Sequence, residues 1–512
     1  MIHRLAFEPR LKFRCSPLEE LIVTQFNMRL SEDEQSRNVR KGALAAIVTQ
    51  VVRVATQTGS VILLSRLLTP VDFGTYAMAS PVLAFAVLFQ DLGLGHATVQ
   101  KDELTHNELS ALFWVNLSVG ALLAVTQVAL SPLVARFYSV PNLAPLTSGM
   151  SVTLLLSGAD VQHLSLLTRQ MRFWTLAGLE SAAALTGLLT SAMVAYVYHS
   201  YWAILAGSLT SGLVLAGGAW LSSGWLPSRP GSIRAARDML SFGLGVTGYN
   251  LAEFLSRNTD GVLIGKVWGA ASLGAYNRAY RLLLFPLQQV SNPMVRIMLP
   301  TLSGLLKEPE RYRDSFRRAV LPALLLVLPG VAFMIASADT LVETLLGGQW
   351  SEAAPIFVAL SIAGLLQTSN SPANWLFLSQ GRTKEYMRWG LFNVSTSILA
   401  FICGLPFGPV GVASAYSISE CVRTPILWWL IGRRGPVRHR DLMKVVGPHL
   451  AGAFASVVTV HLLHRWLLAR SIGGIPDLAA CFCLSYAASL TIVALFPACR
   501  GEMWRYARIR GG

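Results

Sequence analysis

The stretch EFLSRNTDGVLIG (residues 253–265) places Glu253, Arg257 and Asp260 in a segment that otherwise reads as apolar. The preceding sequence MLSFGLGVTGYNLA (239–252) and the sequence from Val262 onward, VLIGKVWGAASLG (262–274), consist almost entirely of small or hydrophobic residues. What three ionisable side chains do in such a segment depends on the solvent around it. The composition of the whole chain therefore decides how this stretch is interpreted.

The composition is that of a membrane protein. Of 512 residues, 53% are hydrophobic and 13% are charged, and the mean hydropathy is +0.50; a soluble domain is about 25% charged. Apolar runs of about 20 residues, the length with which a helix spans a bilayer, recur along the chain. Helices satisfy their own backbone groups in lipid. We therefore predict an all-α polytopic fold with fourteen spans. The predicted spans are 43–63, 73–95, 109–131, 147–167, 174–198, 202–225, 240–264, 272–300, 317–338, 352–378, 387–405, 409–431, 446–467 and 475–497.

The net charge of +15 is distributed so that it orients the protein. Of the 42 Lys and Arg residues, 31 lie in or beside alternate connecting segments, beginning with the N-terminal one, and 5 lie in the segments between. This asymmetry is the positive-inside rule, and it predicts an even number of spans with both termini cytoplasmic. Because the basic excess is explained by topology, no nucleic-acid partner is expected.

The six cysteines do not suggest a disulfide framework, since most lie within or beside spans. Cys481 and Cys483 have C-x-C spacing, which we interpret as packing, so no metal and no cofactor is predicted. Residues 1–41 lack the uninterrupted apolar core of a cleavable signal peptide. The sequence from Met28 onward resembles a short cytoplasmic lead-in, so residues 1–27 are interpreted as a mis-assigned start.

The two halves of the chain repeat at an offset of 200 residues. VILLSRLLTPVDFGTY (61–76) aligns with GVLIGKVWGAASLGAY (261–276), so that Gly74 meets Gly274 and Tyr76 meets Tyr276. The repeat predicts two pseudo-symmetric six-helix bundles around a central cavity, as in many secondary transporters. The predicted units are a cytoplasmic segment (1–41), an N-terminal bundle (42–225), a linker (226–239), a C-terminal bundle (240–431), a basic loop (432–445), two extra helices (446–497) and a cytoplasmic tail (498–512).

The same offset aligns polar stripes on the first helix of each repeat. Gln50, Arg53 and Gln57 fall on Asn250, Glu253 and Arg257, with spacings of 3 and 4 that define one helix face. Each charge exposed to lipid at a helix centre costs about 2.5–3.5 kcal/mol. The four charges Arg53, Glu253, Arg257 and Asp260 would together cost about 10–14 kcal/mol, comparable to the stability of a fold. They must therefore face one another or water, and the three on 240–264 can pair partly along their own helix.

Two interpretations of these stripes remain open. One is a structural ion-pair network that ties the first and seventh spans together. The other, which we favour, is a wet central cavity that receives an anionic substrate. Further polar faces support it, although each residue could also join helices in lipid. These faces comprise Arg281, Gln288, Asn292 and Arg296 in 272–300, and Gln367, Asn370 and Asn374 in 352–378.

Polar residues elsewhere in the spans are weaker indicators. Asp160, His163 and Glu180 could line the N-terminal bundle or act as proton sites, and packing explains them equally well. Glu420 and Arg423 are interpreted as a local pair near the cytoplasmic end of 409–431.

Several stretches resemble a known family. LSRLLTPVDFGTYA (64–77), DLGLGHATVQK (91–101), LTRQMRFWTLA (167–177) and above all SRNTDGVLIGKVWGAASLGAYNRAYRLLLFPLQQ (256–289) are similar to the polysaccharide-export branch of the multidrug/oligosaccharidyl-lipid/polysaccharide flippase superfamily. The resemblance is to Wzx-type exporters of the colanic-acid and succinoglycan kind, and it extends over residues 40 to 435.

The resemblance implies an inner-membrane flippase, not an enzyme, with two bundles arranged as a V. Its substrate would be an undecaprenyl-pyrophosphate-linked oligosaccharide, its surroundings membrane lipid, and its partners a polysaccharide polymerase and chain-length machinery. Arginine suits pyrophosphate because its planar fork matches phosphate oxygens, so Arg53, Arg257, Arg281 and Arg296 are the candidate pyrophosphate ligands. The candidates for lining the cavity and binding sugar are Gln50, Gln57, Asn250, Gln288, Asn292, Gln367, Asn370 and Asn374. By likeness to ion-driven relatives, Glu253 and Asp260 are the candidate proton- or sodium-coupling residues.

Three other functions remain as alternatives. A drug/ion antiporter and a lipid II flippase belong to the same superfamily. A membrane glycosyltransferase or polymerase would need a sizeable outside loop with acidic residues, and the longest predicted one, PLVARFYSVPNLAPL (132–146), has no carboxylate. The sequence also lacks a Walker motif, so ATP is not expected to drive transport directly.

Overall fold

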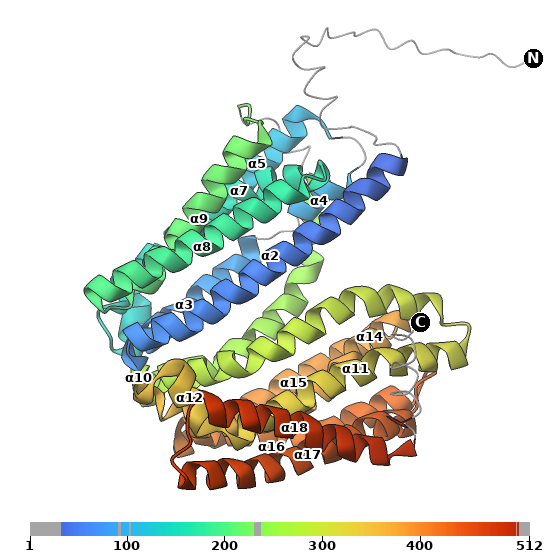
Figure 1. Cartoon of the computed structure of the whole chain (residues 1–512). Helices are drawn as coiled ribbons and strands as arrows, with labels where there is room; N and C mark the ends of the chain where they lie inside the picture. Colours follow the sequence, from blue (N-terminus) through green and yellow to red (C-terminus); the bar gives the residue numbers. More distant parts are fainter. Residues whose placement is uncertain (1–31, 91–93, 102–103, 230–236, 498, 501–512) are drawn as a thin grey trace, which may run out of the picture.

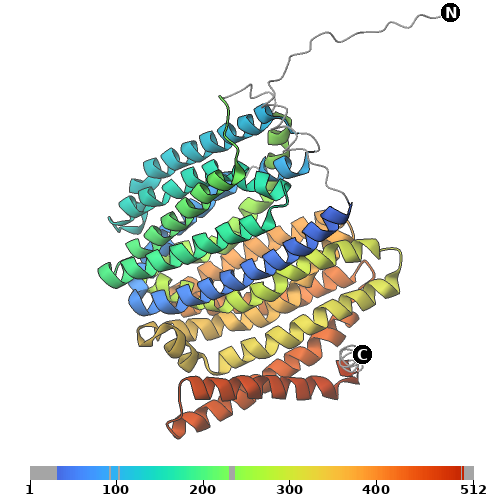
Figure 2. The same cartoon turned by 45° about the horizontal axis from the view of Figure 1, so that its top comes forward.

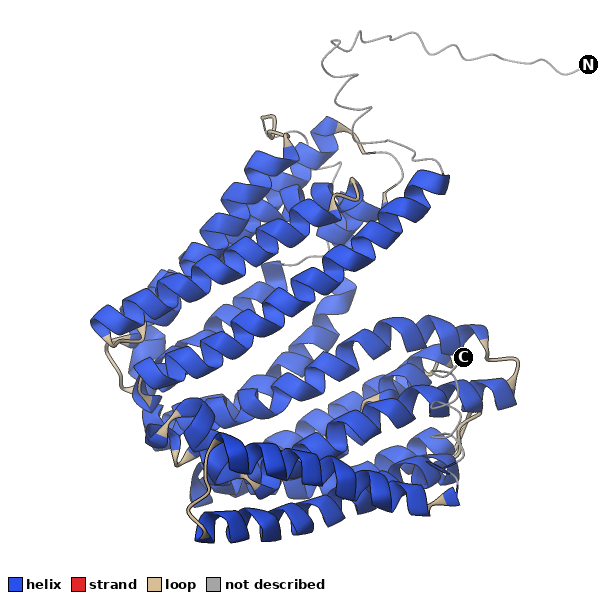
Figure 3. Cartoon of the chain, in the orientation of Figure 1, coloured by secondary structure: helices blue, strands red, loops and turns tan. Residues whose placement is uncertain are grey.

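The computed structural model describes residues 32–90, 94–101, 104–229, 237–497 and 499–500. The side chains of residues 32–41, 43, 96–97, 237–253, 292–293 and 296 lie outside this description. Within the described ranges the secondary structure is entirely helical (Figure 3). The all-α fold predicted from the composition is therefore confirmed.

The helices form two arms that meet at one end (Figure 1). The first arm contains α2 (Glu32–Leu67), α3 (Pro70–Gln90), α4 (Leu94–Gln100), α5 (His106–Tyr138), α6 (Leu143–Met150), α7 (Val152–Arg169), α8 (Phe173–Tyr198) and α9 (Trp202–Ser223). The second contains α10 (Arg237–Gly304), α11 (Pro309–Ala336), α12 (Ala338–Leu346), η2 (Gly348–Trp350), α13 (Ala353–Asn370), α14 (Pro372–Ser379), α15 (Thr383–Gly404), η3 (Leu405–Phe407), α16 (Gly408–Gly432), α17 (His439–Ala469) and α18 (Ile475–Leu495). Figure 1 shows the arms diverging toward the end where α2 begins, and Figure 2 shows the α17–α18 hairpin at the outer edge of the second arm.

The described parts of the fourteen predicted spans lie mainly on helices, although 147–167 divides between α6 and α7 and 352–378 between α13 and α14. The spans 240–264 and 272–300 are two helices, as predicted; they follow one another through the non-helical Gly269 (φ 82°, ψ −176°) and together carry the label α10. Glycine reaches this conformation without the steric cost that other residues would have. Ten helical segments of the described chain are long and apolar enough to cross a membrane. The count of fourteen crossings and the boundaries of the predicted units stay predictions.

Apolar side chains divide between the outer surface and the junction of the arms. Large ones such as Leu221 and Met193 are exposed, as expected for helices that face lipid. The largest buried cluster joins both arms and includes Leu68, Phe73, Tyr276 and Trp350. The arms are therefore held together mainly at their converging end.

The internal repeat is confirmed by a reciprocal helix crossing between α3 and the second part of α10. A Cβ atom added to Gly74 would lie 1.7 Å from the carbonyl oxygen of Ala270, and one added to Gly274 would lie 1.9 Å from that of Pro70. Pro70 and Ala270 are themselves 200 residues apart, so each half presents the same two positions to the other. Such a self-complementary contact is the signature of a twofold relation.

Candidate functional site

The polar stripe on α2 is exposed and faces the second arm. Gln50, Arg53 and Gln57 are all exposed. The amide nitrogen Nε2 of Gln50 donates a hydrogen bond to Oε1 of Gln289 on α10. Because Arg53 and Gln57 lie three and seven residues further along α2, they share the side of the helix that makes this contact. Gln50 is the residue of this stripe that has a described contact to the second arm.

Arg53 forms an ion pair within its own arm. Its Nη2 lies 2.9 Å from Oε2 of Glu180 on α8, and the two side chains are 52% and 42% exposed. An ion pair with this exposure contributes only about 0–1 kcal/mol, so a stronger anion could displace the carboxylate. The alternative interpretation, an ion-pair network joining 43–63 to 240–264, stays a prediction, because the side chain of Glu253 lies outside the described residues.

A groove of about 330 Å³ adjoins this pair. Its walls come from three helices of the first arm, and most of the side chains are small. They are Thr49 and Arg53 of α2, Glu180, Ser181, Ala183 and Ala184 of α8, and Ser211 and Leu215 of α9. The groove thus combines one guanidinium, one carboxylate and three hydroxyl groups. The sequence identified Glu180 only as a possible lining or proton site, because nothing local indicates that it lies beside Arg53.

The predicted partners on α10 are only partly described. Arg257, Arg281 and Gln288 are exposed, as a role between the arms requires. The side chains of Asn250, Glu253, Asn292 and Arg296 lie outside the described residues, so their proposed roles stay predictions.

Asp260 differs from its neighbours because it is buried. Its Oδ2 accepts a hydrogen bond of 2.8 Å from the hydroxyl of Tyr276, and its Oδ1 accepts one of 2.8 Å from the amide of Gly261. One of these two contacts therefore runs to the second part of α10, beyond Gly269, whereas the sequence suggested pairing with charges along its own helix. The sequence repeat aligned Tyr276 with Tyr76. That Tyr276 donates a hydrogen bond to Asp260 depends on how the chain turns at Gly269.

The polar residues of α13 mostly join α13 to α16. Gln367 Nε2 donates to the hydroxyl of Tyr416 at 2.7 Å. Asn370 Nδ2 donates to Oγ1 of Thr424 at 2.8 Å, and its Oδ1 accepts from Trp428 Nε1 at 3.0 Å. These contacts match the alternative in which such residues bind neighbouring helices. Asn374 lies on α14 and differs, since its Oδ1 is buried without a described hydrogen-bond partner.

Glu420 and Arg423 form the expected pair, with 2.7 Å between Oε1 and Nη2. Arg423 is 2% exposed and also donates to Ser397 Oγ at 2.6 Å and to the carbonyl of Asn393 at 2.8 Å. The pair is therefore part of the interior of the second arm, where it links α16 to α15.

The converging end is sealed by contacts between the arms. Trp350 Nε1 donates to the carbonyl of Ser65 at 2.7 Å, and Arg66 Nη2 donates to the carbonyl of Thr344 at 2.6 Å. The guanidinium of Arg278 is buried over the ring of Phe73, with its carbon 3.4 Å from the ring centroid. A buried cation on an aromatic face contributes about 2 kcal/mol when desolvated. The arms are therefore closed here, while the stripe on α2 remains exposed.

Comparisons with known proteins agree with this architecture. Residues 63–355 match a family described as polysaccharide biosynthesis protein. The chain is 22% identical over 397 residues to the lipopolysaccharide biosynthesis protein WzxC of Escherichia coli (strain K12), covering 76% of this chain and 80% of that protein. It is 26% identical over 402 residues to the teichuronic acid biosynthesis protein TuaB of Bacillus subtilis (strain 168), covering 77% and 83%. Its fold resembles that of the lipid II flippase MurJ in an inward closed conformation, with a TM-score of 0.69, 14% identity and coverage of 89% and 98%.

Proposed function

Because this chain belongs to the polysaccharide biosynthesis protein family, in the polysaccharide-export branch of the multidrug/oligosaccharidyl-lipid/polysaccharide flippase superfamily, we propose that it translocates a lipid-linked oligosaccharide. The substrate is an undecaprenyl-pyrophosphate-linked repeat unit, moved from the cytoplasmic to the periplasmic leaflet of the inner membrane. The oligosaccharide then serves surface polysaccharide synthesis.

The observation that carries this proposal is the half-exposed guanidinium of Arg53, which lies one turn along α2 from Gln50, the residue that contacts the second arm. Hydrogen bonds to charged groups contribute about 1.5–3 kcal/mol each, and arginine can make two of them to one phosphate. The exposed pair with Glu180 contributes only about 0–1 kcal/mol. A pyrophosphate that reaches Arg53 therefore displaces the carboxylate of Glu180. Arg257 and Arg281, which are exposed on α10, supply further positive charge.

The arrangement of the arms supports alternating access. They diverge toward the end where α2 begins, which is the predicted cytoplasmic side, and are sealed at the other by Trp350 and Arg278. In the proposed cycle the polar headgroup enters between the arms while the polyprenyl chain stays in lipid. The seal then opens, and the headgroup leaves toward the periplasm.

Ion coupling is proposed to act through carboxylates near these arginines. Protonation of Glu180 would release Arg53 for the pyrophosphate, and the contact at 2.9 Å makes this link direct. Glu253 and Asp260 stay the proposed proton- or sodium-coupling residues of the second arm. Asp260 could act there through its hydrogen bond to Tyr276, which any change in its protonation would alter.

The test is complementation of a strain that lacks this protein. Deletion should abolish the surface polymer and cause the lipid-linked unit to accumulate on the inner leaflet. Arg53→Ala and Arg257→Ala should reproduce both effects, and Arg53→Lys should recover part of the activity because it restores charge without the planar fork. Arg311→Ala is the matched control, since Arg311 also pairs with a glutamate, at 2.6 Å to Glu308, but is exposed at the start of α11.

Other outcomes would contradict the proposal. Normal polymer output from both arginine variants would reduce Arg53 and Arg257 to structural roles. A deletion that stops cell-wall synthesis instead would favour a lipid II flippase, and cation efflux from vesicles would favour a drug/ion antiporter. For coupling, Glu180→Gln should transport with altered dependence on pH or sodium. An unchanged ion dependence would remove Glu180 from the mechanism.

A further inference from the structure

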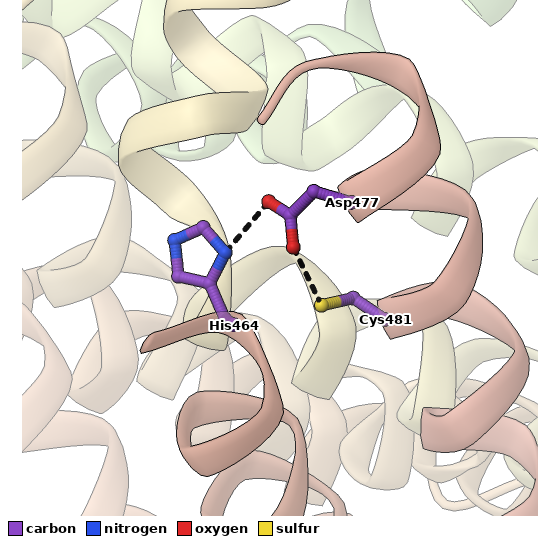
Figure 4. A group of neighbouring side chains, drawn as sticks. All are labelled: His464, Asp477 and Cys481. Carbon is purple, nitrogen blue, oxygen red and sulfur yellow. Dashed lines mark hydrogen bonds and ion pairs between the residues drawn. The ribbon is translucent and has the colours of Figure 1, made fainter. Parts of the chain in front are cut away.

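A second polar cluster lies in the α17–α18 hairpin, apart from the face described above. His464 comes from α17, and Asp477 and Cys481 come from α18 (Figure 4). Nδ1 of His464 lies 2.7 Å from Oδ2 of Asp477, and the thiol of Cys481 donates to Oδ1 of the same carboxylate at 3.3 Å. His464 is 5% exposed, and the other two side chains are fully buried.

Local structure explains how the three side chains meet. Asp477 and Cys481 are four residues apart on α18 and therefore share one face of that helix. The chain reverses between α17 and α18 through Ser471 (φ 59°) and Gly474 (φ 70°), so the last turns of α17 lie beside the first turns of α18. This reversal brings His464 to the face that carries the carboxylate and the thiol.

The donor atoms suit a transition metal. A histidine nitrogen, a carboxylate oxygen and a cysteine sulfur are the three ligand types that zinc accepts, at about 2.0–2.3 Å. The three donor atoms all lie within 4.8 Å of one another, so small side-chain rotations would bring them around one ion. We propose that His464, Asp477 and Cys481 bind one divalent cation of the zinc class, with water in the fourth position.

The net charge of the site and the ligand types favour a zinc-class cation over magnesium or calcium. A divalent cation with one carboxylate, one thiolate and a neutral imidazole has no net charge, which limits the cost of burial in a membrane-embedded hairpin. The hard cations magnesium and calcium prefer oxygen ligands and would not select the thiolate. Binding releases the thiol proton of Cys481 and any proton carried by His464, as metal sites in general require.

The ion would cross-link the hairpin where it reverses. The hairpin is attached to α11 through Ser485 Oγ, which donates to the carbonyl of Pro329 at 2.7 Å, and through Tyr486, which donates to that of Leu326 at 2.6 Å. A metal between α17 and α18 would therefore hold both helices in one position against the second arm. The competing explanation is a metal-free hydrogen-bonded triad, which needs no thiolate.

The experiment titrates Co²⁺ into the purified full-length protein after dialysis against a chelator. Cobalt substitutes for zinc and gives a charge-transfer band when a thiolate binds it. We expect this band to saturate at one ion per chain and to disappear when Zn²⁺, which binds such a site more tightly than cobalt, is added. Cys481→Ser should abolish the band, and His464→Ala should weaken binding at least about tenfold, since the loss of even outer-shell partners costs about 10–100-fold.

Two neighbouring residues provide matched controls. Cys483 is an exposed cysteine two residues beyond Cys481, and His461 is an exposed histidine one turn before His464. Cys483→Ser and His461→Ala should bind cobalt as the native chain does. Absence of the thiolate band, or equal bands in Cys481→Ser and Cys483→Ser, would overturn the proposal. If Cys481→Ser folds poorly, a cobalt-induced rise in melting temperature that His464→Ala lacks and His461→Ala keeps provides the same decision.

Discussion

Adding one methyl group at Gly74 should open the sealed end of the V. The Cβ of Gly74→Ala would lie 1.7 Å from the carbonyl oxygen of Ala270, whereas real Cβ contacts stay above 3.0 Å, so α3 and α10 must separate by at least 1.3 Å. The obstacle is backbone, so a side-chain rotation cannot relieve it. Overpacking of this kind costs about 1–3 kcal/mol, and here the cost applies to the closed arrangement. An energy of this size shifts the equilibrium between the closed and open arrangements of this end about 5–150-fold toward the open one.

The opening can be measured by cysteine accessibility. Ser65 is fully buried in the seal, and its carbonyl accepts the hydrogen bond from Trp350. Ser65→Cys should react slowly with a membrane-impermeant maleimide added from the side predicted to be periplasmic, and mass spectrometry would locate the label. Gly74→Ala should raise this labelling rate by about 5–150-fold. Gly274→Ala should raise it similarly, because its added Cβ would lie 1.9 Å from the carbonyl oxygen of Pro70.

A glycine in open space provides the control for this prediction. A Cβ added to Gly217 of α9 meets nothing within 4 Å, so Gly217→Ala should leave the labelling rate unchanged. Equal rates in folded Gly74→Ala and Gly217→Ala would refute the reasoning that this crossing holds the seal closed.

Two further predictions concern the interior of the second arm, and both are measured by thermal unfolding of the purified protein. Tyr276→Phe leaves Oδ2 of the buried Asp260 without its hydroxyl donor, so it should lower stability by about 1–3 kcal/mol; an unchanged melting temperature would mean that this bond contributes nothing. Arg423→Leu leaves the buried Glu420 without its ion-pair partner and should cost about 3–5 kcal/mol. The same substitution at the exposed Arg311 should cost less than about 1 kcal/mol, and equal losses at the two arginines would contradict the assignment of Arg423 to the interior.

Much of the fold was predictable because its signals are local. Apolar runs of bilayer length indicated the helices, and the offset of 200 residues indicated the repeat that the Gly74–Gly274 crossing confirms. The break between 240–264 and 272–300 was predicted and Gly269 lies within it, but the sequence did not specify the angle between the two helices. This angle in turn decides that Tyr276, sixteen residues along the chain, donates to Asp260.

The candidate site was predictable as a set of residues but not as a set of contacts. The spacing of Gln50, Arg53 and Gln57 predicted one helix face, and the structure exposes that face toward α10. The partner of Arg53 could not be predicted, since Glu180 is 127 residues away and several carboxylates were equally plausible. The partners of His464 could not be predicted either, and the sequence assigned this residue no role.

The sequence alone determined that this protein is helical, embedded in a membrane and built from two related halves. Hydropathy and periodicity suffice for these properties, because in lipid each helix must satisfy its own backbone groups. The tertiary structure alone decided which end is sealed, which carboxylate holds Arg53, and that His464, Asp477 and Cys481 share one buried cluster. Ion pairs and hydrogen bonds act over about 3 Å, so they depend on how helices cross and bend, and residue spacing along the chain does not specify these angles.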